Sequence, residues 1–317
     1  MPEPLDEGTR AVLEMLNADG AVRMHEGTPE AAREMIETMV HLIDEPGPEV
    51  DAVEDTMVPG PAGDVPVRIY RPEGSGRTPG LLVFFHGGGF VIGSPNTHDT
   101  QCRYLCKHAG VVVVSVDYRL APEHPHPAAI EDCYATLLWA ADNGELLGAD
   151  TSRLAVGGDS AGGNLSAVIC QEARDKGGPA ISFQLLWYPS VAAKNEGNFA
   201  KGSMKECSEG YFLDRPTMEW FYGHYVPDDM DRADPRVAPL ETEDLSGLPP
   251  AFVLTAGYDP LRDGGRDYAE RMRKVGVPVD YTCYETTIHG FLNMTKVIPV
   301  AMDALDESAQ KLKAALG

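Results

Sequence analysis

Short apolar runs alternate with longer amphipathic stretches along most of the chain. The run from Val111 to Val116 is the most continuous, as in a central parallel strand that is buried on both faces. Strands that alternate with helices predict an α/β fold, with a mostly parallel sheet of eight strands and helices on both faces. The predicted strands are 52–58, 65–70, 81–85, 111–116, 153–157, 183–188, 251–256 and 279–285, and the predicted helices are 98–109, 128–142, 161–176, 262–275 and 300–316.

Two regions fall outside this alternation. Residues 1–45 carry two amphipathic patterns, at about 4–18 and 29–44. Residues 190–236 begin with a polar, glycine-bearing run and continue into a predicted helix at 214–225, with Asp214 as its N-cap and a proline in its first turn. Both regions could be surface helices that only pack on the sheet. Aromatic side chains gather in the second region, namely Tyr211, Phe212, Trp220, Phe221, Tyr222 and Tyr225.

Charge and composition narrow the class of protein. The chain has 317 residues, of which 43% are hydrophobic and 24% charged, so it can bury one large α/β domain or two smaller ones. Its formal net charge is −23, from 49 acidic and 26 basic residues. That balance argues against nucleic acid and anionic membrane surfaces as partners, and it identifies no substrate.

Targeting and metal signals are weak. No stretch approaches the roughly 18 apolar residues of a membrane span, and the segment 1–7 does not begin a signal peptide. The six cysteines are scattered without C-x-x-C pairs, which favours reduced thiols in a cytoplasmic protein. Cys102 and Cys106 are one helical turn apart but have no evident further ligands, so we expect no metal site.

The most informative motif lies where the predicted strand 153–157 meets the helix 161–176. Gly158-Asp159-Ser160-Ala161-Gly162 fits the G-x-S-x-G nucleophile elbow in its required context of strand, sharp turn and helix. The glycines remove side chains where strand and helix approach, and the serine hydroxyl then projects at the helix N-terminus. Ser160 is therefore a candidate nucleophile, and Asp159 beside it is expected to be structural.

A glycine run follows a buried strand about seventy residues upstream. Leu81–Phe85 is followed by His86-Gly87-Gly88-Gly89-Phe90. Such a run could be a flexible loop, but upstream of a serine elbow it matches the order of an esterase oxyanion loop, whose backbone N–H groups bind developing negative charge. His86 is expected to hold this loop by hydrogen bonding rather than to transfer protons.

An acid and a base should follow the serine in the chain. His289 comes just after the strand 279–285, and Asp259 comes just after the strand 251–256, at the sheet edge where sites form in α/β proteins. Asp263 and Glu285 are rival acids. We favour Asp259 because it is the first acidic residue after its strand, whereas Asp263 falls in the first turn of the next helix, an ordinary place for a carboxylate.

Five motifs in this order resemble the hormone-sensitive-lipase-type carboxylesterases, the family IV bacterial esterases of the α/β-hydrolase fold. The resemblance spans most of the chain from about residue 55 to its end. The motifs are HGGGF at 86–90, DYRLAPEHPHPAA at 117–129, GDSAGG at 158–163, DPLRD at 259–263 and HGF at 289–291.

The resemblance implies residue roles. Ser160 would be the nucleophile, Asp259 the acid and His289 the base of a triad that needs no cofactor. The N–H groups of Gly88, Gly89 and Ala161 would form the oxyanion hole, and candidates for binding substrate are Phe90, Tyr188 and Phe212.

The resemblance also implies a domain organisation and a substrate class. Residues 1–45 and 190–236 would form a helical cap over a catalytic domain made of 46–189 and 237–317. A cap over a buried site suits small soluble esters of short-to-medium acyl chains. An amidase or a specialised deacetylase could use the same triad, and a non-catalytic small-molecule receptor on this fold would lack the histidine that is present here. A homodimer is compatible with the sequence.

Overall fold

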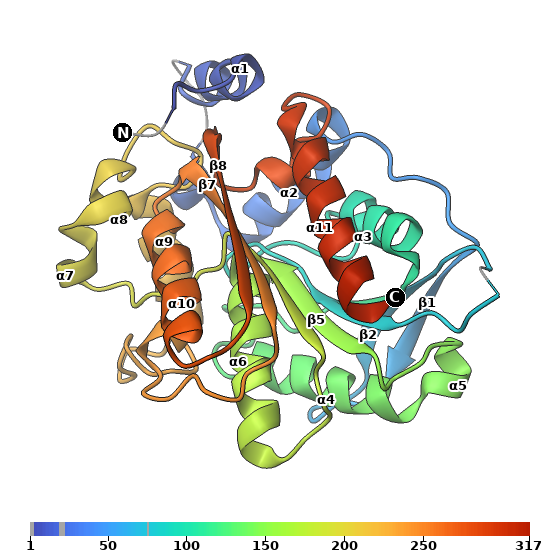
Figure 1. Ribbon diagram of the computed structural model, residues 1–317. Coiled ribbons are helices and arrows are strands. Elements are labelled where there is room, and N and C mark those ends of the chain that lie inside the picture. Colours follow the sequence, from blue (N-terminus) through green and yellow to red (C-terminus); the bar gives the residue numbers. More distant parts are fainter. Residues whose placement is uncertain (1–2, 19–22, 75) are drawn as a thin grey trace.

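The computed structural model describes residues 3–18, 23–74 and 76–317, and its centre is a single eight-stranded sheet (Figure 1). The strand order is β1-β2-β4-β3-β5-β6-β7-β8. Strands β3 to β8 run parallel, while β2 runs antiparallel to both of its neighbours. The strands are β1 (Ala52–Val58), β2 (Val65–Arg71), β3 (Leu81–Phe85), β4 (Val112–Val116), β5 (Leu154–Asp159), β6 (Phe183–Trp187), β7 (Ala251–Tyr258) and β8 (Val279–Ile288).

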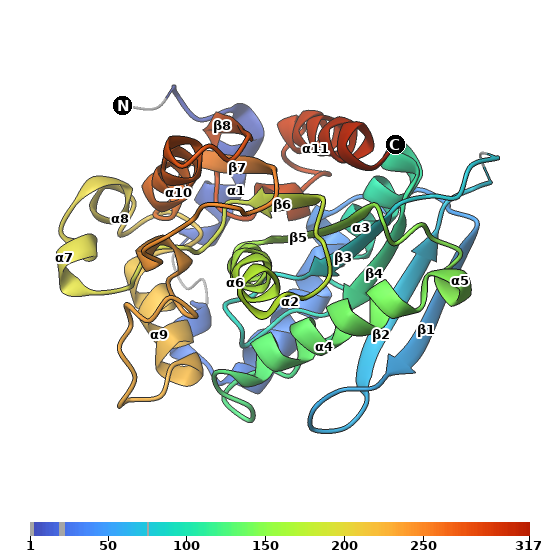
Figure 2. The ribbon, with the colours of Figure 1, turned by 60° about the horizontal axis from the view of Figure 1, so that its bottom comes forward.

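Helices cover both faces of the sheet, as Figure 2 shows, and the predicted fold class is confirmed. The alternate residues of β3 point to opposite faces, so that Leu81 and Val83 pack in one apolar core and Leu82 and Phe84 in the other. The first core includes residues of α4 (Ala128–Asp142), α6 (Ala161–Lys176) and α10 (Arg262–Lys274), and the second includes residues of α3 (Asp99–Leu105) and α11 (Val300–Leu316).

The predicted helix 98–109 is only partly α-helical. The α-helix α3 ends at Leu105, and one π-helical turn, Cys106–Gly110, completes the connection to β4. Gly110 has a φ of 70°, a left-handed conformation that glycine adopts at no steric cost and that ends the helix here. A short helix, α5 (Gly144–Leu147), lies between α4 and β5.

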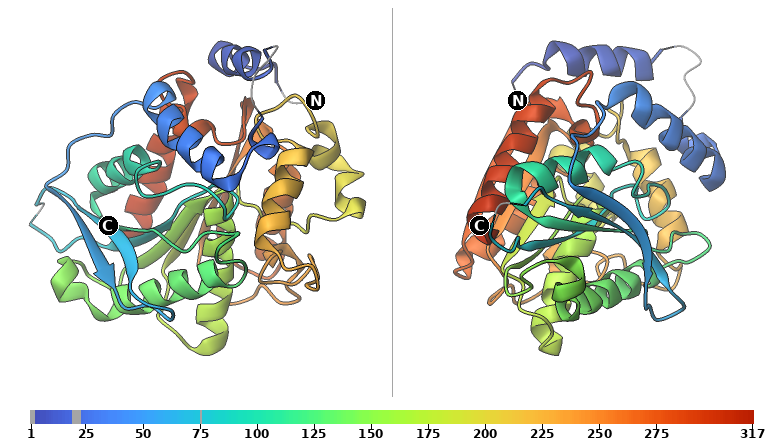
Figure 3. Two further views of the ribbon diagram at one scale, coloured as in Figure 1. Left: turned by 180° about the vertical axis from the view of Figure 1, so that it is seen from behind. Right: turned by 90° about the vertical axis from the view of Figure 1, so that its right-hand side faces the viewer.

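The two regions outside the alternation lie side by side in Figure 3. The N-terminal region forms α1 (Glu7–Leu16), a 3-10 turn (Met24–Glu26) and α2 (Pro29–Ile43). Two segments of the predicted cap, residues 1–2 and 19–22, lie outside the described residues. The second region forms α7 (Glu196–Phe199), α8 (Gly202–Glu206) and α9 (Arg215–Tyr225).

Side-chain caps fix where these outer helices begin. Asp6 accepts a hydrogen bond from the backbone N–H of Thr9 at the start of α1. Asp214 does the same for Thr217 at the start of α9, as its sequence predicted. Each cap satisfies one N–H that the helix itself leaves without a partner. Across the three described ranges, we find no helix with the length and apolar character needed to cross a membrane.

Candidate active site

Ser160 lies at the sharp turn between β5 and α6. Its φ of 53° and ψ of −112° are rare for a residue with a side chain and mark a strained backbone. A Cβ atom at Gly158 or at Gly162 would overlap the carbonyl oxygen of Phe85 on the neighbouring strand. Only glycine fits at these two positions, so the elbow pattern follows from the close approach of β5, α6 and β3.

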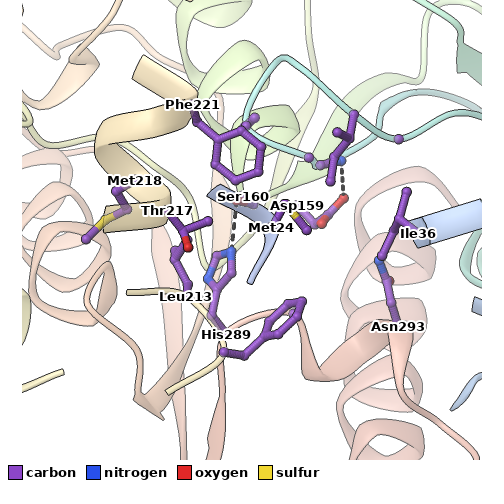
Figure 4. Close-up of a pocket in the computed structure, with 18 of the residues that line it drawn as sticks. Met24, Ile36, Asp159, Ser160, Leu213, Thr217, Met218, Phe221, His289 and Asn293 are labelled. Atoms are coloured by element: carbon purple, nitrogen blue, oxygen red, sulfur yellow. Dashed lines mark hydrogen bonds between the residues drawn. The ribbon is translucent and has the colours of Figure 1, made fainter. Parts of the chain in front are cut away.

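The structure brings Ser160, His289 and Asp259 together in one chain of hydrogen bonds. His289 Nε2 lies 2.9 Å from Ser160 Oγ, a contact that Figure 4 draws as a dashed line. His289 Nδ1 lies 2.7 Å from Asp259 Oδ2. Asp259 is completely buried and also accepts a hydrogen bond from the N–H of Leu261 at 2.7 Å. Since a carboxylate only accepts, Nδ1 of His289 carries the proton and its Nε2 lone pair faces the serine.

The rival acids lie elsewhere. Asp263 accepts from the N–H of Ser203 at 2.9 Å and pairs with Arg262 at 3.1 Å, so it attaches α10 to the outer helix α8. Glu285 is exposed on β8. Geometry therefore favours Asp259 over both.

The glycine loop after β3 faces the serine. Gly88 and Gly89 have φ values of 117° and 59°, and a Cβ atom on Gly89 would overlap the ring of Phe221 from α9. The N–H groups of Val91 and Ile92 both donate to the carbonyl of Gly88. Within the described chain, the N–H groups of Gly88 and Gly89 have no acceptor. They are free to donate to a ligand.

The third expected donor belongs to α6. Ala161 is the first residue of this helix, where an N–H group has no partner inside the helix. The positive end of the helix dipole also lies here. The loop and the helix start thus contribute Gly88, Gly89 and Ala161 to the same cavity as Ser160.

Asp159 links this loop to the elbow. Its Oδ1 accepts a hydrogen bond from the N–H of Gly87 at 2.7 Å and lies 3.0 Å from Nε2 of the buried His98. Burial alone would raise the pKa of Asp159, but the charge and hydrogen bond of His98 lower it overall. Burial likewise would lower the pKa of His98, and Asp159 raises it instead. Asp159 and His98 therefore form a buried pair in which each favours the charged form of the other.

His86 remains neutral beside this pair. Burial, and next the charge of His98, lower the pKa of His86 to about 3. Its Nδ1 lies 2.7 Å from the carbonyl oxygen of Gly87, and its ring stacks on Tyr118 at 4.2 Å between centroids. These contacts hold the loop in place.

A mainly apolar cavity surrounds the serine. Phe90 and Phe212 line it, together with Met24 and Ile36 from the N-terminal region and Phe221 from α9. In Figure 4, Leu213, Thr217 and Met218 lie on one side of the line from Ser160 to His289, and Ile36 lies on the other.

The third candidate for substrate contact lies elsewhere. Tyr188 is absent from the described lining of the cavity, and its ring packs edge-on against His289 with 4.8 Å between centroids. Tyr188 follows β6 directly and is buried behind the imidazole. It therefore supports His289 rather than lining the substrate cavity.

The sequence analysis missed two residues that the structure places in the lining of the cavity, His98 and Lys194. Nothing near His98 in the sequence reveals its contact with Asp159. Lys194 lines the cavity although the run that follows it, residues 195–198, is polar and typical of a surface loop. Among the described residues, no group of three His, Cys, Asp or Glu side chains is arranged to hold a metal ion.

The chain is similar to known proteins over most of its length. Residues 82–293 match a family model described as alpha/beta hydrolase fold. The carboxylic ester hydrolase LipN of Mycobacterium tuberculosis is 50% identical over 256 residues, which cover 78% of this chain and 67% of LipN. The ethyl acetate hydrolase of Pseudomonas putida is 35% identical over 293 residues, 91% of each chain.

Solved structures extend the match to nearly the whole chain. The LAE6 alpha/beta hydrolase enzyme from the metagenome of Lake Arreo superposes with a TM-score of 0.93 at 43% identity, covering 98% of both chains. A thermostable esterase from Pseudomonas putida gives a TM-score of 0.92 at 33% identity over 100% of this chain and 99% of its own. The sequence motifs, the fold and these relatives agree, and the chain belongs to the hormone-sensitive-lipase-like carboxylesterases of the α/β-hydrolase family.

Proposed function

We propose that this protein hydrolyses small carboxylic esters of short-to-medium acyl chains through an acyl-enzyme on Ser160. The observation that carries the proposal is the continuous contact from Ser160 Oγ to His289 at 2.9 Å and on to Asp259 at 2.7 Å. The names of the relatives support the reaction class, since they include a carboxylesterase and an ethyl acetate hydrolase.

In the first half of the reaction, Ser160 attacks the ester carbonyl while Nε2 of His289 takes the hydroxyl proton. Asp259 holds the imidazole in the tautomer that has Nε2 free and stabilises the imidazolium that forms. The complete burial of Asp259 strengthens this interaction because little water competes for the carboxylate. His289 then gives the proton to the leaving alcohol, and the acyl group remains on Ser160.

The N–H groups of Gly88, Gly89 and Ala161 are assigned to the carbonyl oxygen as it becomes negative. Donors on a fixed backbone need not reorganise as the charge develops, which is the main advantage of such a site. Water, activated by His289, then releases the acid and restores the serine. All steps use side chains, backbone and water, so the mechanism needs no cofactor.

Substrate size follows from the cavity in this proposal. Its walls come from both outer regions, with Met24 and Ile36 on one side and Phe221 on the other, and they are largely apolar. We assign the pieces 1–45 and 190–236 to a cap that encloses the substrate over the catalytic domain. Small soluble esters fit such a space better than a lipid droplet does. The six free cysteines fit a reducing compartment, and we place the enzyme in the cytoplasm.

The alternative functions involve the same three residues, Ser160, His289 and Asp259. An amidase or deacetylase would keep all three residues and differ in the leaving group that it accepts. A receptor would bind without turnover, but the distance of 2.9 Å between His289 Nε2 and Ser160 Oγ favours chemistry.

The test is a series of 4-nitrophenyl esters from acetate to palmitate, with matched 4-nitroanilides. We expect the highest kcat/KM between two and about eight acyl carbons and much slower cleavage of the anilides. Ser160→Ala should lower kcat by about 10⁴- to 10⁶-fold while the circular dichroism spectrum stays unchanged. A folded Ser160→Ala variant that retains more than a few per cent of the activity would refute the assigned nucleophile.

A further inference from the structure

Lys194 is a charged side chain in an unexpected place. It lies in the segment after β6 and lines the same cavity as Ser160. Only 1% of its surface is exposed. Lysine is among the residues that are least often buried without an ionic partner, so its contacts decide what it can do.

The contacts of Lys194 leave its ammonium group incompletely used. Its Nζ donates to the carbonyl of Ala192 at 2.7 Å and lies 5.5 Å from the centre of the Tyr222 ring. An ammonium group has three N–H donors. Throughout the described parts of the chain, no carboxylate lies within salt-bridge distance of it.

This arrangement is costly in the absence of a ligand. Burial lowers the pKa of Lys194 to about 7, against the opposing pull of the Asp259 charge. Near pH 7 the ammonium and the neutral amine are therefore both populated, and the ammonium form lies in a mainly apolar cavity without a paired anion among the described residues. Such a group stabilises nothing by itself, and a perturbed titratable side chain in a cleft is typical of a functional position.

We propose that Lys194 binds a carboxylate group carried by the ester substrate, which makes the enzyme selective for anionic esters. This inference rests on the proposed function, because it names the substrate class of the same site. A substrate carboxylate in the cavity would accept hydrogen bonds from the unused N–H donors of Lys194. It would also supply the counter-charge that the cavity lacks.

The charge of the rest of the molecule strengthens the need for this residue. With a formal net charge of −23, the protein repels anions at long range. An anionic ester can then be preferred only through a local cation. Arg23 also lines the cavity, but its side chain donates to Asn17 in an exposed contact, whereas Lys194 is buried.

The carboxylate could belong to the acid part or to the alcohol part of the ester, and two substrate pairs separate these sources. The first pair is monoethyl adipate and ethyl hexanoate, which have the same number of acyl carbons. The second pair is the butyrate ester of 3-hydroxypropionate and butyl butyrate. In each pair the measured quantity is the ratio of kcat/KM for the charged ester to kcat/KM for the neutral ester.

We expect wild type to give a ratio of at least one for one of the two pairs, and that pair identifies the source. Lys194→Met should lower this ratio by roughly 10- to 100-fold, the value of a hydrogen-bonded charge. The matched control is Lys176→Met, which removes the same charge at the far end of α6, about 24 Å from Ser160 along its 16 residues. That control should leave the ratio unchanged.

Three outcomes would count against the inference. It is wrong if wild type gives ratios far below one for both pairs while it hydrolyses the neutral esters, a result that leaves the proposed function intact. It is also wrong if Lys194→Met and Lys176→Met change the ratio equally. If no ester is hydrolysed, the proposed function and the inference both fall. Should Lys194→Met fold poorly, Lys194→Gln keeps the polarity and removes the charge, and the wild-type ratios still decide.

Discussion

The carboxyl edge of the sheet and the outer helices meet at one cavity, yet different forces hold them. At the sheet edge, backbone geometry leaves almost no freedom. Ser160 has a positive φ, Gly158 and Gly162 have no room for a Cβ atom, and Asp259 is completely buried. A shift of a few tenths of an ångström there would make atoms overlap.

The outer helices are attached by a few backbone hydrogen bonds, such as those from the N–H of Asp6 to the carbonyl of Thr286 and from the N–H of His126 to that of Tyr225, and by side-chain contacts. Asn17 Nδ2 donates to the carbonyl of Gly210 at 3.0 Å, and His25 Nδ1 lies 3.0 Å from Thr217 Oγ1. The helices α7 and α8 have only four and five residues. Contacts of this kind can be exchanged without disturbing the sheet. We infer that the carboxyl edge of the sheet, the rigid frame, carries out the reaction. The outer helices, the exchangeable layer, select the substrate and tolerate substitution.

The largest expected effect is at Asp259, the assigned acid of the triad at the sheet edge. Asp259→Asn should lower kcat by about 10⁴-fold, because an amide can donate to Nδ1 and so favours the wrong imidazole tautomer. Asp263→Asn removes a carboxylate four residues away that contacts Ser203 and Arg262, and it should cost less than tenfold. Steady-state rates of the two purified, folded variants decide, and equal losses would remove Asp259 from its assigned role.

The second test compares two glycines of similar conformation. Gly89, at the sheet edge, has a φ of 59°, and Gly210, among the outer helices, has a φ of 84°. A Cβ atom on Gly89 would meet the ring of Phe221, whereas one on Gly210 would meet nothing within 4 Å. Both Ala variants pay about 1–2 kcal/mol for the left-handed conformation.

Only Gly89→Ala should then displace an oxyanion donor, with a loss of about 10²- to 10³-fold in kcat. Gly210→Ala should retain kcat within about threefold. The measurement is kcat with a single short-chain ester, alongside the melting temperature of each variant. If both variants lose activity in proportion to their loss of stability, Gly89 has no role in catalysis beyond its effect on stability.

The third test concerns the buried pair beneath the oxyanion loop. Asp159 raises the pKa of His98 above its usual value near 6.5. The stabilisation that the pair gives to the folded state is therefore complete below pH 6.5, and it is lost as pH rises through the raised pKa of His98. The pKa of Asp159 is lowered, so Asp159 stays charged above pH 6. In Asp159→Asn the burial of His98 would instead lower its pKa.

Wild type should therefore exceed Asp159→Asn in free energy of unfolding by about 1–3 kcal/mol at pH 6. The advantage should shrink steadily toward pH 9. Urea unfolding curves at four or five pH values measure it. A constant difference across this range would mean that His98 and Asp159 do not form an ion pair.

Much of the sheet edge could be predicted because its constraints are local in sequence. The elbow needs glycines two residues before and after Ser160, and the loop needs a glycine run after a strand. Parallel strands bring their carboxyl ends together, so Asp259 and His289 could be expected at one edge of the sheet, although Asp263 and Glu285 remained rival acids. The eight strands and the main helices were confirmed for the same reason, since each carries its own periodic pattern.

The outer layer could be predicted only as helices. The contact between His25 and Thr217 joins residues that are 192 positions apart, and no local pattern encodes it. The same holds for Lys194, because the polar run that follows it in sequence predicts an exposed loop whereas its side chain is buried. Tyr188 was expected in the substrate cavity and lies behind His289 instead, because the direction of its side chain depends on the turn after β6.

The smallest expected effect lies where the outer layer touches the frame. Arg33 on α2 donates from Nε to the carbonyl of Val91 at 2.8 Å and from Nη2 to that of Ala121 at 2.8 Å, next to the oxyanion loop. It also pairs with Glu123 at 2.7 Å, and this contact lowers the pKa of Glu123 to about 2.

Arg33→Met should remove all three contacts and loosen one wall of the cavity, so we expect KM to rise about two- to tenfold while kcat changes less. Glu123→Gln keeps both backbone contacts and loses only a largely exposed ion pair, of a kind that contributes about 0–1 kcal/mol, so its KM should stay within twofold of wild type. Steady-state kinetics on one ester measure both variants. A large fall in kcat for Arg33→Met would show that α2 supports the oxyanion loop itself, and the boundary between rigid frame and exchangeable layer would then lie one helix further out.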